Sequence, residues 1–259
     1  MTGAVTLKNR TNWILAGLTL LLAILDITAF PARLLPRMHL LDIDPLYFTI
    51  MLNHLIICLI AYPVLHFACP EFSLGFRGKG LWPGLQKYGY VGLMICSISF
   101  IGFYVGLFPF DAHPSLLKVL IEGVIYYIGV AIVEELYVRG LLLNLLERLL
   151  GKRPDRTFLA ILLSSLLFGL GHIPGALGLP FYVMASKVVW TISMGFFLGM
   201  LYKKSGSLLT PILLHFFINL SALPCCFSTL KGYAPLTLVI VVPAYVILGI
   251  YSLCQLERS

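Results

Sequence analysis

Charged side chains are scarce in this sequence of 259 residues. Asp, Glu, Lys and Arg together make up 11% of it, whereas hydrophobic residues make up 59%. A soluble globular domain carries about 25% charged residues, so this composition excludes an ordinary soluble protein. Acidic residues are the scarcest, 11 against 18 Lys and Arg, and the net charge is +7. The basic residues lie in short connections between apolar runs rather than together on a soluble surface, so they do not indicate nucleic-acid binding.

The usual metal and disulfide patterns are also absent. None of the six cysteines forms a CxxC pair, and no HExxH motif occurs. Most of the cysteines fall in or beside apolar runs, so we expect buried apolar side chains rather than disulfides or metal ligands. The glycines of FGLGHIPGALG follow no predicted strand and precede no Lys-Ser/Thr pair, so they do not indicate a phosphate loop.

Long apolar runs dominate the sequence instead. They cover approximately residues 13–30, 46–67, 88–108, 116–150, 157–171, 181–202, 208–223 and 236–253. A transmembrane helix needs about 20 apolar residues, and prolines fall in or beside most of the connections, where helices are expected to end. The sequence therefore predicts an all-α polytopic membrane protein of eight transmembrane helices. No linker, repeat or soluble domain separates them, so we expect one transmembrane domain over residues 1–259.

The basic residues predict the orientation of these helices. Lys and Arg are enriched in cytoplasmic loops, and the eight-helix interpretation puts twelve of them on one side: Lys8, Arg10, Arg77, Lys79, Lys87, Arg148, Lys152, Arg153, Arg156, Lys203, Lys204 and Arg258. The other side has only Arg33, Arg37 and Lys231. We therefore expect both termini to be cytoplasmic.

Three ionisable residues interrupt the fourth apolar run. They are Glu134, Glu135 and Arg139 of the sequence EELYVR. An ionisable side chain costs roughly 3 kcal/mol or more at the centre of a bilayer, so such residues usually mark a functional or tightly paired site. Glu135 and Arg139 are four residues apart, which predicts an ion pair along one helix face. Glu134 lies about 100° away around the helix, so it needs a partner on another segment or acts as a working carboxylate.

Two later segments offer such partners. FGLGH contains Phe168 and His172, and HFFIN contains His215 and Asn219. Each pair is spaced by four residues and so lies on one face of a helix.

Their depths are compatible. Glu134 and His172 lie nineteen residues before and after the middle of the basic connection GKRPDR, so in a helical hairpin they reach about the same depth. His215 lies about ten residues beyond the next basic connection, roughly 15 Å into the membrane at 1.5 Å per residue. The sequence therefore predicts that these groups converge within the membrane.

Such a cluster fits hydrolysis of a peptide bond. Glu134 and His172 could bind a water molecule and remove its proton, and His215 and Asn219 could donate hydrogen bonds to the oxyanion. Alternatively, Glu134, His172 and His215 could be the three ligands of a catalytic zinc ion with an open fourth position. The residue types satisfy both schemes, so the predicted cofactor is either none or zinc.

The three motifs resemble EExxxR, FxxxH and HxxxN of the CPBP family, also called Abi, which comprises type II CAAX prenyl proteases and bacteriocin-processing enzymes. The resemblance implies an intramembrane endopeptidase, of the glutamate type or the metallo type, with its catalytic core at about residues 116–224 and a site that opens towards the cytosol. It implies the water-activating and oxyanion-stabilising pairs described above. It also implies supporting roles for Glu135, Arg139 and Phe168.

The resemblance implies a membrane-associated peptide or protein substrate, lipidated or bearing a leader. The other expected partner is membrane lipid, and the expected location is a bacterial plasma membrane. Two other functions remain open: a proton-coupled carrier, in which buried Glu, Arg and His form a relay, and a non-catalytic membrane partner or immunity factor.

Some intramembrane polar residues lie outside the motifs. Lys118 and Glu122 are four residues apart and are expected to pair. Asn53 and His54 are expected to form hydrogen bonds between helices, and Lys187 is expected to extend towards an interface.

Overall fold

A computed structural model of the chain describes residues 2–30, 32–34, 42–70, 72–230 and 232–257. Three basic residues used above to orient the helices, Arg37, Lys231 and Arg258, lie outside the described residues.

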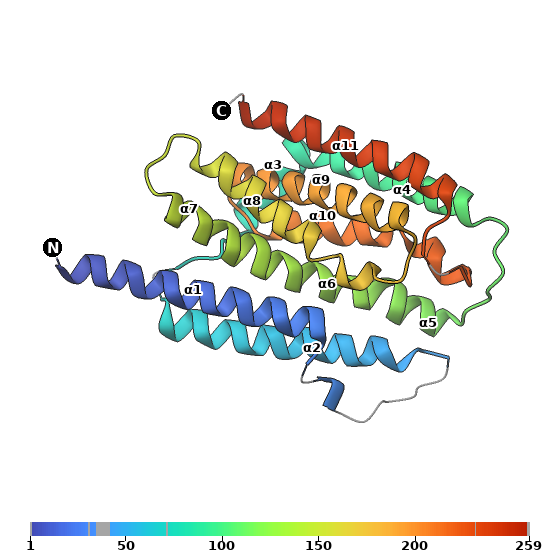
Figure 1. Cartoon of the computed structure of the whole chain (residues 1–259), viewed down its shortest axis with the longest axis horizontal. Coiled ribbons are helices and arrows are strands. Elements are labelled where there is room, and N and C mark those ends of the chain that lie inside the picture. The colour runs from blue at the N-terminus through green and yellow to red at the C-terminus, as the bar shows by residue number, and fades with distance from the viewer. Residues whose placement is uncertain (1, 31, 35–41, 71, 231, 258–259) are drawn as a thin grey trace.

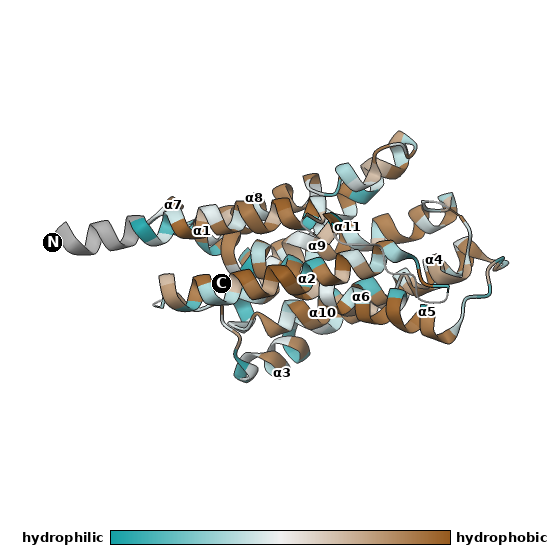
Figure 2. Cartoon of the chain, turned by 90° about the horizontal axis from the view of Figure 1, so that it is seen from below, coloured by the Kyte–Doolittle hydropathy of each residue, from teal (hydrophilic) through white to brown (hydrophobic). Residues whose placement is uncertain are grey.

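Within the described residues, eight helical spans are long and apolar enough to cross a membrane. They are Arg10–Leu34, Pro45–Ala68, Gly78–Leu107, Leu116–Leu150, Arg156–Ala176, Phe181–Ser205, Leu209–Phe227 and Pro235–Glu257. Figure 2 shows that hydrophobic residues predominate along the lengths of these helices. The predicted all-α membrane protein of eight spans is confirmed.

The long helices form one bundle (Figure 1). Along one side lie α1 (Thr2–Thr28) and α2 (Pro45–Pro63), and along the opposite side lie α4 (Tyr90–Leu107) and α11 (Pro235–Glu257). Between these two pairs lie α6 (Tyr126–Glu135), α8 (Arg156–Leu170), α9 (Phe181–Ser205) and α10 (Leu209–Leu220). The central helices carry the polar motifs.

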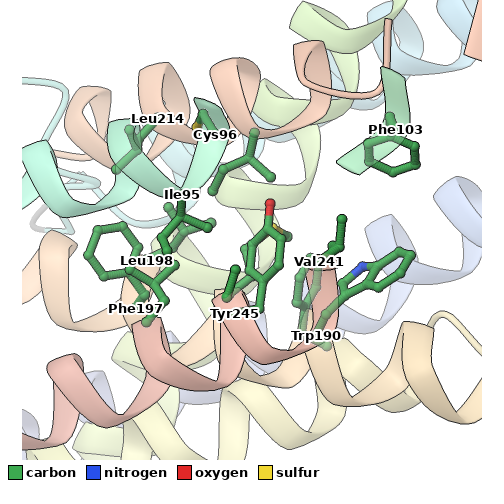
Figure 3. Packing of buried hydrophobic residues seen from close by; sticks show 14 of the residues in the cluster. Ile95, Cys96, Phe103, Trp190, Phe197, Leu198, Leu214, Val241 and Tyr245 are labelled. Carbon is green, nitrogen blue, oxygen red and sulfur yellow. The ribbon is translucent and has the colours of Figure 1, made fainter. Parts of the chain in front are cut away.

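Apolar side chains of α4, α9, α10 and α11 form the largest core cluster (Figure 3). Phe197 and Leu198 of α9 and Leu214 of α10 are completely buried in it. Trp190, Val241 and Tyr245 lie towards its other end. A second cluster joins α1 and α2 to the fourth span, so the fourth span has packed neighbours on both sides.

The fourth span is continuous but not uniformly α-helical. It consists of α5 (Leu116–Leu120), the π-helical η5 (Ile121–Ile125), α6, the π-helical η6 (Leu136–Leu143) and α7 (Asn144–Leu150). Wide π-helical turns change the direction of the following side chains and are common at functional sites. Here η6 begins directly after Glu134 and Glu135.

The polar residues of α7 bond to neighbouring helices. Lys203 on α9 donates to Glu147 at 2.6 Å, and Arg148 donates to Asn12 on α1 at 2.7 Å. The helix ends at Gly151, whose φ of +70° favours glycine.

The third span begins about ten residues earlier than the apolar pattern predicts. Residues 78–87, which lie between the predicted apolar runs 46–67 and 88–108, form η3 (Gly78–Gly80), α3 (Leu81–Gly84) and the start of η4 (Leu85–Gly89). A Cβ atom on Gly84 would lie 2.6 Å from Cβ of Ser205. This close approach to the end of α9 stabilises a helix that hydropathy alone does not reveal.

The described cysteines form no disulfides. Cys69 and Cys96 are buried as expected, but Cys254, near the end of α11, is exposed.

Two loops are joined by Asp111, which lies between α4 and α5, and Thr229, which precedes α11. The Thr229 N–H donates to Asp111 Oδ1 at 2.8 Å, and its hydroxyl donates to Oδ2. These bonds hold the pKa of the Asp111 carboxyl below its ordinary value of 3.8.

We expect Asp111→Ala to lower the thermal unfolding temperature of the detergent-solubilised protein at neutral pH. Because the folded state has the lower pKa, the stabilisation is present above pH 3.8 and is lost as the pH falls through the folded value. The difference between variant and wild type should therefore shrink in acid. Thr229→Val, which keeps the backbone hydrogen bond to Asp111, should lower the unfolding temperature less. Equal unfolding temperatures of wild type and Asp111→Ala at neutral pH would contradict a stabilising role of Asp111.

Candidate active site

The sequence motifs lie on adjacent elements near the middle of the bundle. Glu134 and Glu135 end α6, Arg139 lies in η6, and His215 and Asn219 lie on α10. Helix α10 packs along α6, and α8 packs against η6. Phe168 is in the last turn of α8, and His172 follows two residues after that helix ends.

The predicted ion pair between Glu135 and Arg139 is present and almost completely buried, with 0% and 1% of the two residues exposed. Arg139 Nη1 lies 2.6 Å from Glu135 Oε1, and Nη2 donates to the carbonyl of Gly195 on α9 at 3.1 Å. A Cβ on Gly195 would lie 3.3 Å from Nη2, so glycine lets the guanidinium come close to α9. The guanidinium carbon also lies 4.6 Å from the ring centre of Phe168, a cation–π contact.

Glu135 also holds His215, a contact that the sequence did not predict. His215 is 1% exposed, and its Nδ1 lies 2.8 Å from the Oε1 atom that receives Arg139. An ionised carboxylate only accepts hydrogen bonds, so Nδ1 carries the proton and donates it to Glu135. His215 Nε2 then faces Glu134, whose Oε2 lies 3.6 Å away.

The ring orientation of His172 is fixed by a hydrogen bond to the backbone one turn earlier. Its Nδ1 lies 2.8 Å from the carbonyl oxygen of Phe168. A carbonyl only accepts, so Nδ1 donates and the neutral ring keeps its lone pair on Nε2. The Phe168 ring contacts His172 and His215 edge to face, with ring centres 4.7 and 6.2 Å apart. Phe168 therefore packs between the two imidazoles, which fits its predicted supporting role.

All four predicted catalytic residues line one cavity of about 390 Å³: Glu134, His172, His215 and Asn219. A second cavity of about 810 Å³ lies between α1, the fourth span and the end of α8. Three residues line both cavities: Glu134, His172 and Lys187. The two cavities are therefore adjacent, with these three residues at their junction. Apolar cavities with a few convergent polar groups are typical of sites for small ligands and substrates.

The paired contacts differ from the pairs proposed from the sequence. In the part of the chain that the structure describes, no hydrogen bond or ion pair joins Glu134 to His172, or His215 to Asn219. Glu134 instead contacts His215. Glu134 and His172 share both cavities, so a small molecule between them could contact both.

The zinc alternative requires Glu134, His172 and His215 to converge on one point. Among the described residues, no group of three or more His, Cys, Asp and Glu side chains is arranged to hold a metal ion. These residues therefore do not fit a zinc site in this structure.

A further polar group, on α1 and α2, borders the larger cavity. Asp26 Oδ2 accepts a hydrogen bond from Tyr137 at 3.1 Å, and Oδ1 lies 3.7 Å from His54 Nε2. Asp26 and Tyr137 both line this cavity. Tyr137 was not predicted as a site residue, although it follows Glu134 by three residues and so lies on nearly the same helix face.

The other expectations for intramembrane polar residues have mixed outcomes. Lys118 lies 3.5 Å from Glu122, as expected. Asn53 donates to the backbone of Leu25 on α1 at 2.8 Å, also as expected. Lys187 lines both cavities instead of extending towards an interface.

Comparison with known proteins identifies a family. Residues 115–221 match the family model described as Rce1-like, type II CAAX prenyl endopeptidase Rce1-like. The matched segment contains every residue of the three motifs. No curated protein matches the chain. The family match confirms the resemblance to CAAX proteases predicted from the motifs.

We expect Arg139→Met to destabilise the protein strongly, because it leaves the carboxylate of Glu135 buried without its guanidinium. Breaking a buried pair in this way costs about 3–5 kcal/mol. The matched control is Arg153→Met, which breaks the pair with Asp155, whose two side chains are 59% and 45% exposed, and should cost much less. Unfolding of both variants in detergent measures the difference. Equal losses of unfolding free energy in the two variants would show that burial does not make the Arg139 pair more important for stability.

Proposed function

We propose that this chain, whose residues 115–221 match the Rce1-like family model of type II CAAX prenyl endopeptidases, hydrolyses peptide bonds inside the membrane with Glu134 as the base. The observation that carries the proposal is the common cavity of Glu134, His172, His215 and Asn219. These residues come from three separate motifs, and general packing of polar groups gives no reason for all of them to face one space.

Water activation is assigned to Glu134 and His172. A water molecule between them would donate one hydrogen to the Glu134 carboxylate and one to the free Nε2 of His172. Glu134 removes a proton as the water oxygen bonds to the carbonyl carbon of the substrate. The same proton then passes to the leaving amine as the C–N bond breaks. The products are a carboxylic acid and an amine, so atoms and charge balance.

Stabilisation of the oxyanion is assigned to His215 and Asn219. The Asn219 amide faces the smaller cavity and has two N–H donors. His215 keeps Nδ1–H on Glu135, so only Nε2 can act in the cavity. In its doubly protonated form it donates Nε2–H to the oxygen on which charge develops.

Glu135 and Arg139 are positioning residues in this proposal. Glu135 fixes the tautomer and the ring orientation of His215, as a carboxylate commonly does for a working histidine. Arg139 holds Glu135 and ties it to α9 and Phe168. Neither reaches the reacting atoms.

The proposed substrate is a membrane-associated peptide or protein, lipidated or bearing a leader. The larger cavity supports this because α1 and the fourth span line it largely with apolar side chains, including Leu20, Ile27 and Leu142. On the basis of the loop charges we also propose that both termini are cytoplasmic, and the proposed location is a bacterial plasma membrane. Membrane lipid is then the other partner, and nucleic acid is not one.

Glu134→Gln should remove the base while keeping shape and hydrogen bonding. We expect the rate of cleavage to fall about 10²- to 10⁴-fold, the usual contribution of general acid–base catalysis. The measurement compares membrane-peptide profiles of a deletion strain rescued with wild type or variant, followed by assays on the peptide that accumulates. Glu147→Gln is the matched control, because Glu147 lies on the same span but outside both cavities.

If Glu134→Gln cleaved the peptide at the wild-type rate, the proposed mechanism would be wrong. If wild type and Glu134→Gln give the same peptide profile while reconstituted wild type moves protons with a solute, the protein is a carrier. If both protect the cell equally from a toxic peptide, it is an immunity factor.

We expect chelators to leave the activity unchanged, because the described carboxylates and imidazoles form no metal-binding group. Purified protein treated with 1,10-phenanthroline and then dialysed should retain its wild-type rate. Loss of activity that returns on adding zinc would instead support the three-ligand alternative.

A further inference from the structure

Lys187 is the third residue, besides Glu134 and His172, that lines both cavities. It lies in the second turn of α9 and is partly buried. It belongs to none of the three motifs. Lys187 therefore borders the same two cavities as the proposed base, Glu134.

The Lys187 ammonium has no hydrogen bond or ion pair with any described residue. Two other lysines of the spans are paired: Lys118 lies 3.5 Å from Glu122, and Lys203 lies 2.6 Å from Glu147. An unpaired cation within a membrane is costly and usually faces a water-filled cavity where it serves a function. Structural pairing therefore does not explain why Lys187 faces the cavities.

The proposed reaction needs a strong donor at this place. Of the donors proposed above, His215 can offer the oxyanion only Nε2, which also lies beside Glu134, and Asn219 offers only a neutral amide. An ammonium ion supplies both a hydrogen bond and a full positive charge, and charge-assisted hydrogen bonds are roughly twice as strong as neutral ones. Such donors act most strongly where water is excluded.

We propose that Lys187 is a further catalytic residue, whose ammonium stabilises the negative charge on the carbonyl oxygen of the substrate. The inference rests on the proposed function. As the water oxygen bonds to the carbonyl carbon, the π electron pair moves to the oxygen, which accepts a hydrogen bond from Nζ. When the C–N bond breaks, the pair returns to form the carbonyl. Lys187 keeps its protons throughout, because the leaving amine takes its proton from Glu134.

The test measures kcat and KM of wild type, Lys187→Met, Lys187→Arg and Glu134→Gln in detergent with a cleaved peptide. We expect Lys187→Met to lower kcat about 10²- to 10³-fold, as loss of one oxyanion donor does, with KM little changed. Lys187→Arg keeps the charge, and its kcat should lie between those of wild type and Lys187→Met. Lys204→Met makes the same change at the far end of α9 and should retain wild-type kcat. If Lys187→Met does not fold, Lys187→Gln, which lacks the charge, carries the test with the same expected direction.

A different role for Lys187 is binding a carboxylate of the substrate. In that case Lys187→Met would raise KM, and its effect would disappear with peptides whose carboxyl terminus is amidated and whose acidic side chains are neutralised. That result would overturn the proposal, whereas an equal loss of kcat on free and amidated peptides would support it. If Lys187→Met keeps the wild-type kcat while Glu134→Gln is inactive, only the proposed role of Lys187 is overturned. Full activity of Glu134→Gln overturns the proposed function as well.

Discussion

The site depends on one buried carboxylate. Glu135 Oε1 receives both Arg139 and His215, at 2.6 and 2.8 Å, and nothing of this residue is exposed. A charge buried in this way is tolerated only with close partners, so α6, η6 and α10 are held in one mutual arrangement. Arg139 extends the same constraint to α9 through Gly195. The cavity walls are therefore positioned by an ionic cluster of which only His215 lines the cavity, and the residues at the junction remain free to contact a substrate.

Much of the fold and of the site could be predicted because it depends on spacing along the helix axis. Runs of apolar residues determine the number of spans, and eight are present among the described residues. The spacing of four residues placed Glu135 against Arg139, and equal distance from a basic turn placed Glu134 and His172 at one depth. The four predicted catalytic residues line the same cavity, as their similar depth requires, although depth does not determine which way each side chain faces.

Rotation of a helix about its axis is much harder to predict from sequence. Hydropathy does not define a face when both lipid and core are apolar, so it gave no reason to choose His215 over His172 as the contact of Glu134. The π-helical turns of η5 and η6 shift the faces further. Lys187 and Tyr137 were missed for the same reason. The early start of the third span was missed because it depends on the fit of Gly84 against Ser205, a contact between distant segments.

The junction of the two cavities has a consequence for product release. A chain cut at this junction would leave one fragment on each side, the first in the space of about 390 Å³ and the second in that of about 810 Å³ beside α1. Fragments held in separate spaces need not pass one another before the next substrate arrives. The order of departure would be set by how tightly each space retains its fragment, so changes to the α1 wall would alter turnover without touching the reacting groups.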